Sequence, residues 1–199
     1  MQQSYDKHAH RYDRMLAPIE RHYLAKLRRE TLGLLPDNGT ILEIGAGTGA
    51  NFKFYPRCKR AIASEISFNM IEIAKGRSAF ISLVQADGQD LPFPANHFDA
   101  AFATLVFCSI PKPEKALAEI IRVLKPGGRL ILLEHVRPTG LLGPVFDLLN
   151  FVTVALIEDH FNRRTADLVR AGGFQNVTEK RYLAGILNLI VGEIKTQGS

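Results

Sequence analysis

The chain has 199 residues, of which 46% are hydrophobic and 23% charged, enough for one globular domain with a full core. Two cysteines, Cys58 and Cys108, are too few for a disulfide framework, and no charged-then-apolar signal segment opens the sequence, so we expect a reducing, cytoplasmic setting. A net charge of +5 favours acidic partners, such as an anionic membrane surface or nucleic acid.

Residues 1–36 are expected to form N-terminal cap helices. The seven-residue spacing of Tyr5 and Tyr12 places them on one helix face, so both could fold over a pocket; a frayed terminus with two packed tyrosines is the alternative. From Pro18 to Leu35 the leucine spacing predicts an amphipathic helix. Its basic side suits a lipid surface, or is simply a solvated face.

The next segment, residues 41–51, runs from an apolar stretch into three alternating glycines, Gly45, Gly47 and Gly49. This pattern predicts a buried strand that ends in a loop whose backbone approaches a ligand closely. A dinucleotide loop needs a different glycine spacing, and Glu43 would repel a pyrophosphate. The carboxylate suits an ammonium, directly or through water, which favours S-adenosylmethionine; a glycine turn without a ligand is the alternative.

Further strands alternate with helices along the chain. A second strand over 60–64 ends at Glu65, which is placed to accept both hydroxyls of an adenosine ribose. A helix over 67–77 is predicted to begin with Ser67 as its N-cap, and a third strand over 81–85 runs into Asp87. Next come an apolar strand over 98–104, a helix over 114–124 and, after a Pro-Gly-Gly turn, a strand over 129–133.

This alternation predicts a parallel sheet with ligands at the carboxyl ends of its strands, where Glu43, Glu65, Asp87 and Thr104 all fall. After it, residues 137–161 form an apolar insertion that falls short of the roughly 20 residues needed to cross a bilayer. We interpret it as a lid over the substrate pocket, a membrane-resting helix or a packed core helix. A helix over 163–171 and two late strands, 177–183 and 187–195, end the chain.

Four motifs occur together: the Tyr-Asp doublet of Tyr5-Asp6 and Tyr12-Asp13, the Glu43-x-Gly45-x-Gly47-x-Gly49 loop, the Asp87–Phe93 segment and Leu124-Lys-Pro-Gly-Gly128. They resemble the class I S-adenosylmethionine-dependent methyltransferases, in the ubiquinone/menaquinone and phospholipid methyltransferase group. The resemblance implies one α/β Rossmann-like domain over 1–199, with a seven-stranded, mostly parallel sheet and an antiparallel terminal hairpin. It also implies S-adenosyl-L-methionine as cofactor, with Asp87 accepting from the adenine amine. The cofactor-binding residues it implies are Tyr12, Glu43, Gly45, Ala46, Gly47, Thr48, Gly49, Asn51, Glu65, Ile66, Met70, Ala86, Asp87, Gly88, Thr104 and Leu105.

The acceptor is less clearly indicated. The phrases at 47–56 and 104–110, with Glu134-His135-Val136, resemble animal microsomal alkyl-thiol methyltransferases, whereas His160-Phe-Asn-Arg163 resembles bacterial phosphatidylethanolamine-methylating enzymes. We therefore expect a small hydrophobic or lipid-like acceptor, with thiol sulfur preferred, a phospholipid amine second and a quinone carbon third. Two alternative functions belong to other classes of protein: a non-catalytic cofactor-binding protein and a nicotinamide-dependent dehydrogenase.

Methyl transfer needs alignment first and a base second. The candidates for proton transfer or for closing over the sulfonium are His135, His160 and Tyr5, and Asn162 and Arg163 could hold an anionic group of the acceptor. We expect no metal. We also expect no nucleic-acid substrate, because no Asn-Pro-Pro-Tyr or Asp-Pro-Pro-Tyr sequence follows the fourth strand. An anionic membrane surface is a candidate partner. We expect the protein to be cytoplasmic, with peripheral binding to the membrane as a further candidate, and the sequence does not set the oligomeric state.

Overall fold

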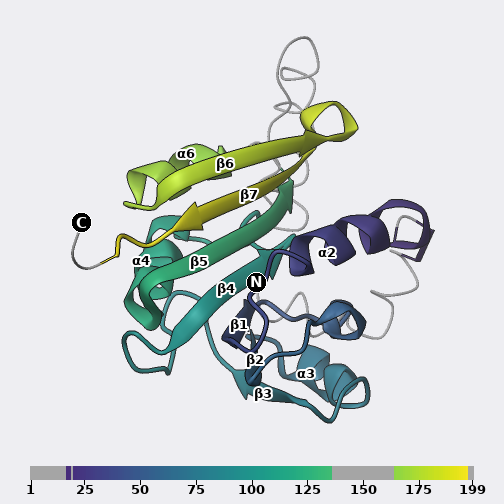
Figure 1. The fold of residues 1–199 in the computed structure, drawn as a ribbon. Helices are drawn as coiled ribbons and strands as arrows, with labels where there is room; N and C mark the ends of the chain where they lie inside the picture. The colour runs from purple at the N-terminus through teal and green to yellow at the C-terminus, as the bar shows by residue number, and fades with distance from the viewer. Residues whose placement is uncertain (1–16, 19, 136–163, 197–199) are drawn as a thin grey trace.

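The fold is a computed structural model that describes residues 17–18, 20–135 and 164–196. Its centre is a seven-stranded sheet in the order β3-β2-β1-β4-β5-β7-β6 (Figure 1). The pairs β3/β2, β2/β1, β1/β4 and β4/β5 are parallel, and β7 runs antiparallel to both β5 and β6. The prediction of a mostly parallel sheet with an antiparallel terminal hairpin is confirmed.

The elements follow the predicted alternation closely. The strands are β1 (Thr40–Ile44), β2 (Arg60–Glu65), β3 (Ile81–Gln85), β4 (Phe98–Thr104), β5 (Leu124–His135), β6 (Gln175–Tyr182) and β7 (Leu187–Glu193). The α-helices are α2 (Ala25–Leu32), α3 (Phe68–Lys75), α4 (Pro113–Val123) and α6 (Thr165–Ala171). Short helical turns occur at η1 (Glu20–Leu24), η2 (Phe52–Phe54) and η3 (Leu183–Gly185).

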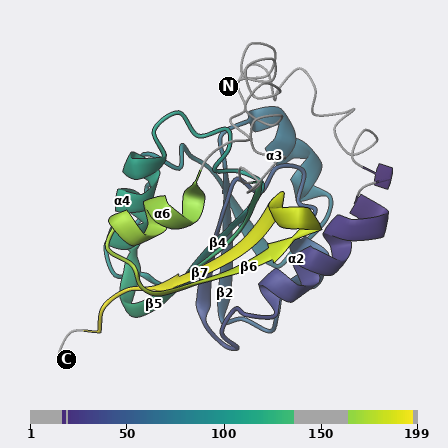
Figure 2. The same ribbon diagram turned by 90° about the horizontal axis from the view of Figure 1, so that it is seen from above.

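Helices cover both faces of the sheet. Viewed from above, α4 and α6 lie on one side of the strands, and α2 and α3 lie on the other (Figure 2). The period-two alternation of a strand sends Leu42 and Ile44 of β1 into the cluster that holds α4 and α6, whereas Ile41 joins the cluster that holds Leu32 of α2. Both faces of β1 are therefore buried, which explains why its sequence is a nearly continuous apolar run.

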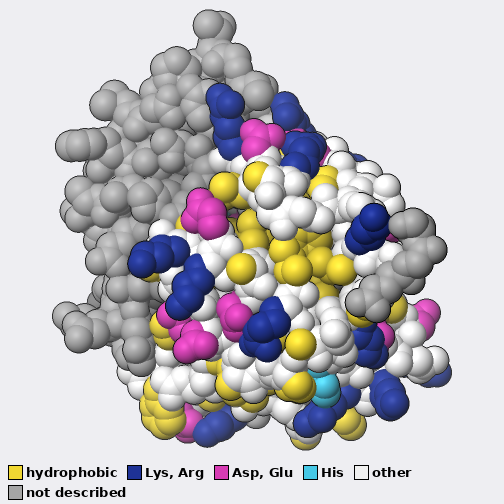
Figure 3. Space-filling view, turned by 90° about the vertical axis from the view of Figure 1, so that its left-hand side faces the viewer, with side chains coloured by type: hydrophobic (Ala, Val, Ile, Leu, Met, Phe, Trp, Pro, Cys, Tyr) yellow, Lys and Arg dark blue, Asp and Glu magenta, His cyan; other side chains and the backbone are white. Residues whose placement is uncertain are grey.

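The surface shown in Figure 3 is not uniformly basic. Lys and Arg side chains are interspersed there with Asp and Glu, around a hollow where hydrophobic side chains gather. Within the described ranges, no helix combines the length and the apolar character that a membrane crossing requires.

The N-terminal helix is shorter than predicted. In place of one helix over 18–35, the structure has the π-helical turn η1 followed by α2, which ends at Leu32. Pro36 disfavours helical geometry at Leu35, and the chain leaves the helix through a turn in which the Leu35 amide donates to the Leu32 carbonyl. The predicted apolar stripe is correct, because Leu24, Leu27, Leu32 and Leu35 are all buried. The rest of the cap, residues 1–16, and the insertion over 137–161 lie outside the described residues.

The Pro-Gly-Gly segment lies within β5 rather than before it. β5 pairs with β4 at Leu124↔Phe98 and next at Arg129↔Ala100, so residues 125–128 form an excursion from the ladder. A Cβ at Gly128 would stand 2.7 Å from the Lys125 carbonyl oxygen, which leaves room only for glycine at this bend.

Substitutions on the buried and exposed sides of helix α4 test the assignment of the core. Ile120 is fully buried in the largest cluster, so Ile120→Ala should lower the free energy of unfolding by about 2–5 kcal/mol, through lost burial and the cavity left behind. Lys115→Ala, on the exposed side of the same helix, should change it by less than about 0.5 kcal/mol. Urea denaturation measures both, and equal effects would contradict the assignment of the core.

Candidate active site

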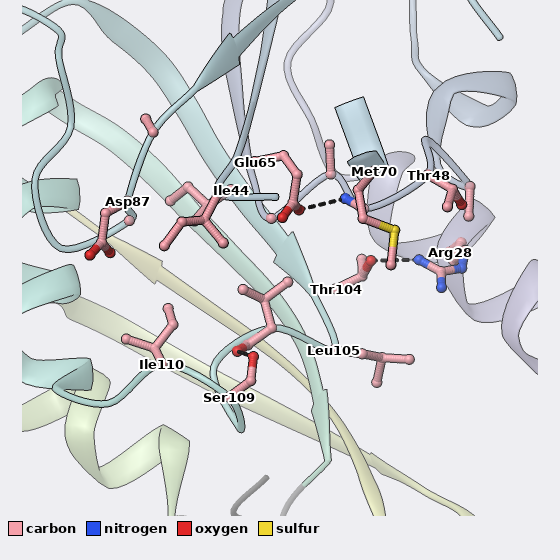
Figure 4. A pocket seen from close by; sticks show the side chains of 18 residues that line it. Arg28, Ile44, Thr48, Glu65, Met70, Asp87, Thr104, Leu105, Ser109 and Ile110 are labelled. Carbon is pink, nitrogen blue, oxygen red and sulfur yellow. Dashed lines mark hydrogen bonds between the residues drawn. The ribbon is translucent and has the colours of Figure 1, made fainter. Parts of the chain in front are cut away.

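A cavity opens where the carboxyl ends of the parallel strands meet. It encloses about 820 Å³ of empty space, part of which is open solvent. The structure brings most of the predicted cofactor-binding residues together around it: Gly45, Ala46, Gly47, Thr48, Glu65, Ile66, Met70, Ala86, Asp87, Gly88, Thr104 and Leu105. In the close-up, Asp87 lies at one end, Arg28 at the opposite end and Glu65 between them (Figure 4). The charged side chains therefore follow one another along the cavity in the order Asp87, Glu65, Arg28, which is acid, acid and base.

The glycine loop forms one wall of the cavity. Gly45 and Gly47 have φ of 67° and 56°, in the left-handed region that favours glycine. A Cβ at Gly45 would meet the Val106 side chain at 2.6 Å, whereas a Cβ at Gly47 would meet no atom of the described chain within 4 Å. Gly45 therefore permits close packing against the turn after β4, and Gly47 leaves its space open to the cavity.

Glu65 connects this loop to the start of α3. Its Oε2 accepts a hydrogen bond from the Gly47 amide at 2.8 Å and its Oε1 accepts one from the Ser67 amide at 2.9 Å. The predicted cap is confirmed, because Ser67 Oγ accepts from the Met70 amide at 3.2 Å. The carboxylate is thus fixed at the end of β2 and faces the cavity as an acceptor suited to a diol.

Hydrogen bonds fix the Asp87 carboxylate and the segment that follows it, and these bonds involve two of the sequence motifs. Its carboxylate accepts from the Gln89 amide at 2.9 Å and from Gln89 Nε2 at 3.0 Å. The segment that follows is tied to α4, because Arg122 donates to the carbonyls of Leu91 and Phe93 at 2.8 and 2.6 Å. The acidic Leu-Pro-Phe segment and the arginine before Leu-Lys-Pro-Gly-Gly therefore form one unit that presents Asp87 to the cavity.

Three predicted cofactor residues, Glu43, Gly49 and Asn51, lie behind the cavity wall rather than on it. The Glu43 carboxylate is fully buried and accepts from Asn51 Nδ2 and Tyr55 Oη, both at 2.6 Å. Burial raises the pKa of Glu43. Gly49 packs on Phe52, which a Cβ there would meet at 2.6 Å. These residues support the loop from below, and a direct contact of Glu43 with an ammonium stays a prediction.

The turn after β4 forms the opposite wall. Leu105 adopts φ of 61°, a conformation that costs a non-glycine residue about 1 kcal/mol. It is held there because its amide donates to the Leu133 carbonyl at 2.7 Å and the next amide, of Val106, donates to Glu134 Oε1 at 3.1 Å. The buried Glu134 on β5 thereby fixes the turn that carries Val106, Ser109 and the other residues of this wall.

Of the candidates for proton transfer, only His135 lies within the described residues. It ends β5 and is not among the residues that line the cavity. Burial lowers its pKa to about 4, so the imidazole is neutral at physiological pH and binds a proton weakly. Tyr5, Tyr12, His160, Asn162 and Arg163 lie outside the described residues, and their predicted roles stay predictions.

Sequence reasoning missed six residues that line the cavity: Arg28, Ile44, Ala50, Val106, Ser109 and Ile110. Val106, Ser109 and Ile110 follow β4 in a phrase that the resemblance had singled out, so that signal was present. Arg28 lies in the helix predicted over 18–35, whose basic side is expected to face either solvent or lipid. That expectation is wrong for this residue, because Arg28 is 5% exposed and its guanidinium lies inside the protein.

The residues present fit S-adenosylmethionine. Asp87 offers an acceptor for an exocyclic amine, Glu65 offers one for ribose hydroxyls, and the Gly47 backbone leaves open the space between loop and ligand. Among the described residues, no cluster of three or more His, Cys, Asp or Glu side chains is arranged to hold a metal ion.

Comparison with known proteins agrees with this geometry. A family described as "Methyltransferase domain" matches residues 42–132. The ubiquinone/menaquinone biosynthesis C-methyltransferase of Azotobacter vinelandii is 31% identical over 75% of this chain and 71% of that protein, and the Pseudomonas fluorescens enzyme is 30% identical over 75% and 70%. A solved methyltransferase structure from Thermotoga maritima, described as a possible histamine N-methyltransferase, is 27% identical with a TM-score of 0.79, covering 98% of this chain and 100% of that one.

The sheet order, the glycine loop and the acidic residues at successive strand ends define a class I S-adenosylmethionine-dependent methyltransferase. The sequence relatives narrow the class further. The chain belongs to the ubiquinone/menaquinone biosynthesis methyltransferase family.

Two glycines of the loop, Gly45 and Gly47, should respond differently to substitution. Gly45→Ala drives a Cβ into Val106 and should destabilise the protein by about 1–3 kcal/mol. Gly47→Ala adds only the backbone strain, about 1 kcal/mol, but fills space facing the cavity and should weaken cofactor binding by about tenfold or more. Thermal unfolding and calorimetric titration with S-adenosylhomocysteine separate the two effects. Unchanged affinity in the Gly47 variant would contradict the assignment of that space.

The lowered pKa of His135 predicts a pH dependence of stability. Because the unfolded chain takes up the proton near pH 6.5 and the folded chain only near 4, stability falls as the pH drops below about 6.5. Between pH 7.5 and 5.5 the wild type should therefore lose about 1 kcal/mol more than His135→Gln. Urea unfolding at the two pH values checks this. Parallel losses in the two proteins would show that the histidine is already solvated.

Proposed function

We propose that this methyltransferase acts on a ring carbon of a small hydrophobic hydroquinone. The observation that carries the proposal is the sequence likeness to ubiquinone/menaquinone biosynthesis C-methyltransferases, which extends over three quarters of the chain. The matching methyltransferase family covers residues 42–132, which include the turn after β4 that forms the far wall of the cavity.

The chemistry of the far wall supports an apolar, flat acceptor. The hydrophobic surface of this wall comes from Leu105, Val106 and Ile110, and Ser109 adds one hydroxyl group. Ser109 Oγ donates to the Val106 carbonyl at 2.9 Å, so its remaining hydrogen-bonding capacity is that of an acceptor, suited to an acceptor molecule's hydroxyl. A hydroquinone has this combination of a flat apolar ring and hydroxyl groups at its edge.

S-adenosylmethionine supplies an activated methyl group, and the chain supplies alignment. The ring carbon forms the bond to the methyl group as the bond between methyl and sulfur breaks, and the ring then loses its proton to water. Holding the two reactants in line can account for several kcal/mol of the barrier. Such a reaction does not depend on a strong base in the protein, which agrees with the low pKa of His135.

A second candidate is methylation of a small amine, which the likeness to the Thermotoga structure favours. A thiol acceptor, the preference drawn from sequence phrases, gains no support from the comparisons. A phospholipid acceptor depends on His160, Asn162 and Arg163, outside the described residues. Arg28 is buried and therefore cannot belong to a basic helix face that docks on anionic lipid.

A product screen tests the proposal. The purified protein and methyl-labelled S-adenosylmethionine would be offered a short-chain prenylated naphthohydroquinone kept reduced, histamine, an alkyl thiol and phosphatidylethanolamine vesicles in parallel. Mass spectrometry would locate the label. We expect a carbon-methylated ring, and exclusive methylation of the amine, thiol or lipid would overturn the proposal.

Variants tie the product to the cavity. Asp87→Ala removes the acceptor at one end and should lower kcat/KM at low cofactor concentration by about tenfold or more. Asp90→Ala is the matched control, because Asp90 is an exposed acid of the same loop that does not line the cavity. Equal losses in both variants would show that the measured activity does not come from this site.

A further inference from the structure

Arg28 stands out among the residues around the cavity. Of the described residues that line it, Arg28 alone carries a positive charge, against the two carboxylates of Glu65 and Asp87. It comes from α2, outside the strand-end loops that supply most of the wall, and it lies at the end of the cavity opposite Asp87 (Figure 4). Only 5% of the residue is exposed, so its charge lies inside the protein rather than in bulk solvent.

The guanidinium is held in a fixed orientation. Nη1 donates to Asn51 Oδ1 at 2.8 Å and to Thr104 Oγ1 at 2.5 Å, both neutral acceptors, and Nε donates to Glu20 Oε2 at 3.1 Å. Asn51 is itself fixed, because its Nδ2 donates to Glu43. Nη2 makes no hydrogen bond to any residue in the described ranges, so its two N–H donors are not used there.

We propose that Arg28 binds the carboxylate of the amino-acid portion of S-adenosylmethionine. The proposal rests on the cofactor, which the family membership establishes, and not on the identity of the acceptor. It gives a role to a residue of the N-terminal helix in a site otherwise made from the ends of β1, β2 and β4 and the loop after β3.

The charge sequence of the cavity supports this orientation. An adenine amine at Asp87 and ribose hydroxyls at Glu65 direct the rest of the cofactor toward Arg28. The amino-acid portion ends in a carboxylate, and an arginine fork is the side chain best matched to it. A buried guanidinium also needs an anionic partner, and the only acid it contacts in the described chain, Glu20, pairs through Nε alone.

Glu43, the other acid near Arg28, does not serve as its anionic partner. The Glu43 carboxylate uses its two oxygens to accept from Asn51 and Tyr55, and burial raises its pKa toward the neutral form. It is linked to Arg28 through Asn51 rather than paired with it directly. A cofactor carboxylate at Nη2 would add an anionic partner on the part of the guanidinium that Glu20, bound at Nε, does not reach.

The test compares two ligands that differ only in the carboxylate: S-adenosylmethionine and decarboxylated S-adenosylmethionine. Calorimetric titration of the wild-type protein should show about 10- to 100-fold tighter binding of the first. In Arg28→Gln the affinity for S-adenosylmethionine should fall by about that factor, while the affinity for the decarboxylated ligand changes by less than about threefold. The preference for the carboxylate should therefore disappear.

Three controls keep the outcome interpretable. Arg21→Gln removes an exposed arginine of η1 that does not line the cofactor cavity, and it should retain the wild-type preference. Binding of 5′-methylthioadenosine, which lacks the whole amino-acid portion, shows whether the adenosine end of the site is intact in Arg28→Gln. Arg28→Lys keeps the charge without the fork and should retain a reduced preference.

Two results would overturn the proposal. One is equal binding of the two ligands by the wild type, which requires no variant to fold. The other is an equal loss of affinity for both ligands in Arg28→Gln, which would show that the arginine only supports the fold. Neither result depends on which acceptor is methylated, so a failed product screen and a failed carboxylate preference are separate findings.

Discussion

Parallel pairing of β1 with β2 and β4 is the constraint on which the site depends. The registers Glu43↔Ala63 and Glu43↔Phe102 align the three strands so that all end at one edge. At that edge the backbone changes direction, and polar groups that a buried sheet cannot accommodate become available to a ligand. The glycine loop and Glu65 occupy adjacent positions because the strands that carry them are neighbours, although 18 residues separate Gly47 from Glu65.

A buried polar network adds rigidity behind this edge. Glu43, Asn51, Thr104 and Arg28 come from β1, the loop before η2, β4 and α2, and each is hydrogen-bonded to at least one other. Such a network is costly unless its members find partners, and here the members fix one another's rotamers. The helix that precedes the sheet in sequence is thereby joined to the centre of the site.

The sequence predicts the part of the site that follows from the pattern of strands, glycines and strand-end acids. Strand alternation, glycine spacing and strand-end acids correctly placed Glu65 and Asp87 on the cavity, because strand ends of a parallel sheet must share an edge. Arg28 was missed, since an arginine on a helix has the same local pattern whether it faces solvent or a cavity. Strand periodicity sends the Glu43 side chain toward α2, and only the packing of Tyr55 and Asn51 shows what it contacts. Its predicted interaction with an ammonium stays a prediction.

The contact between Val106 and the space above Gly45 has an evolutionary consequence. The two positions belong to loops on opposite walls, and the volume of one side chain limits the other. A larger residue at 45 is compatible only with a smaller one at 106, so substitutions at the two positions should be epistatic rather than additive. Diversification of the wall that faces the acceptor is thus restricted by the glycine that faces the cofactor. Relatives that change acceptor would be expected to vary first at Ser109 and Ile110, which lie on the same wall but do not approach Gly45 in this way.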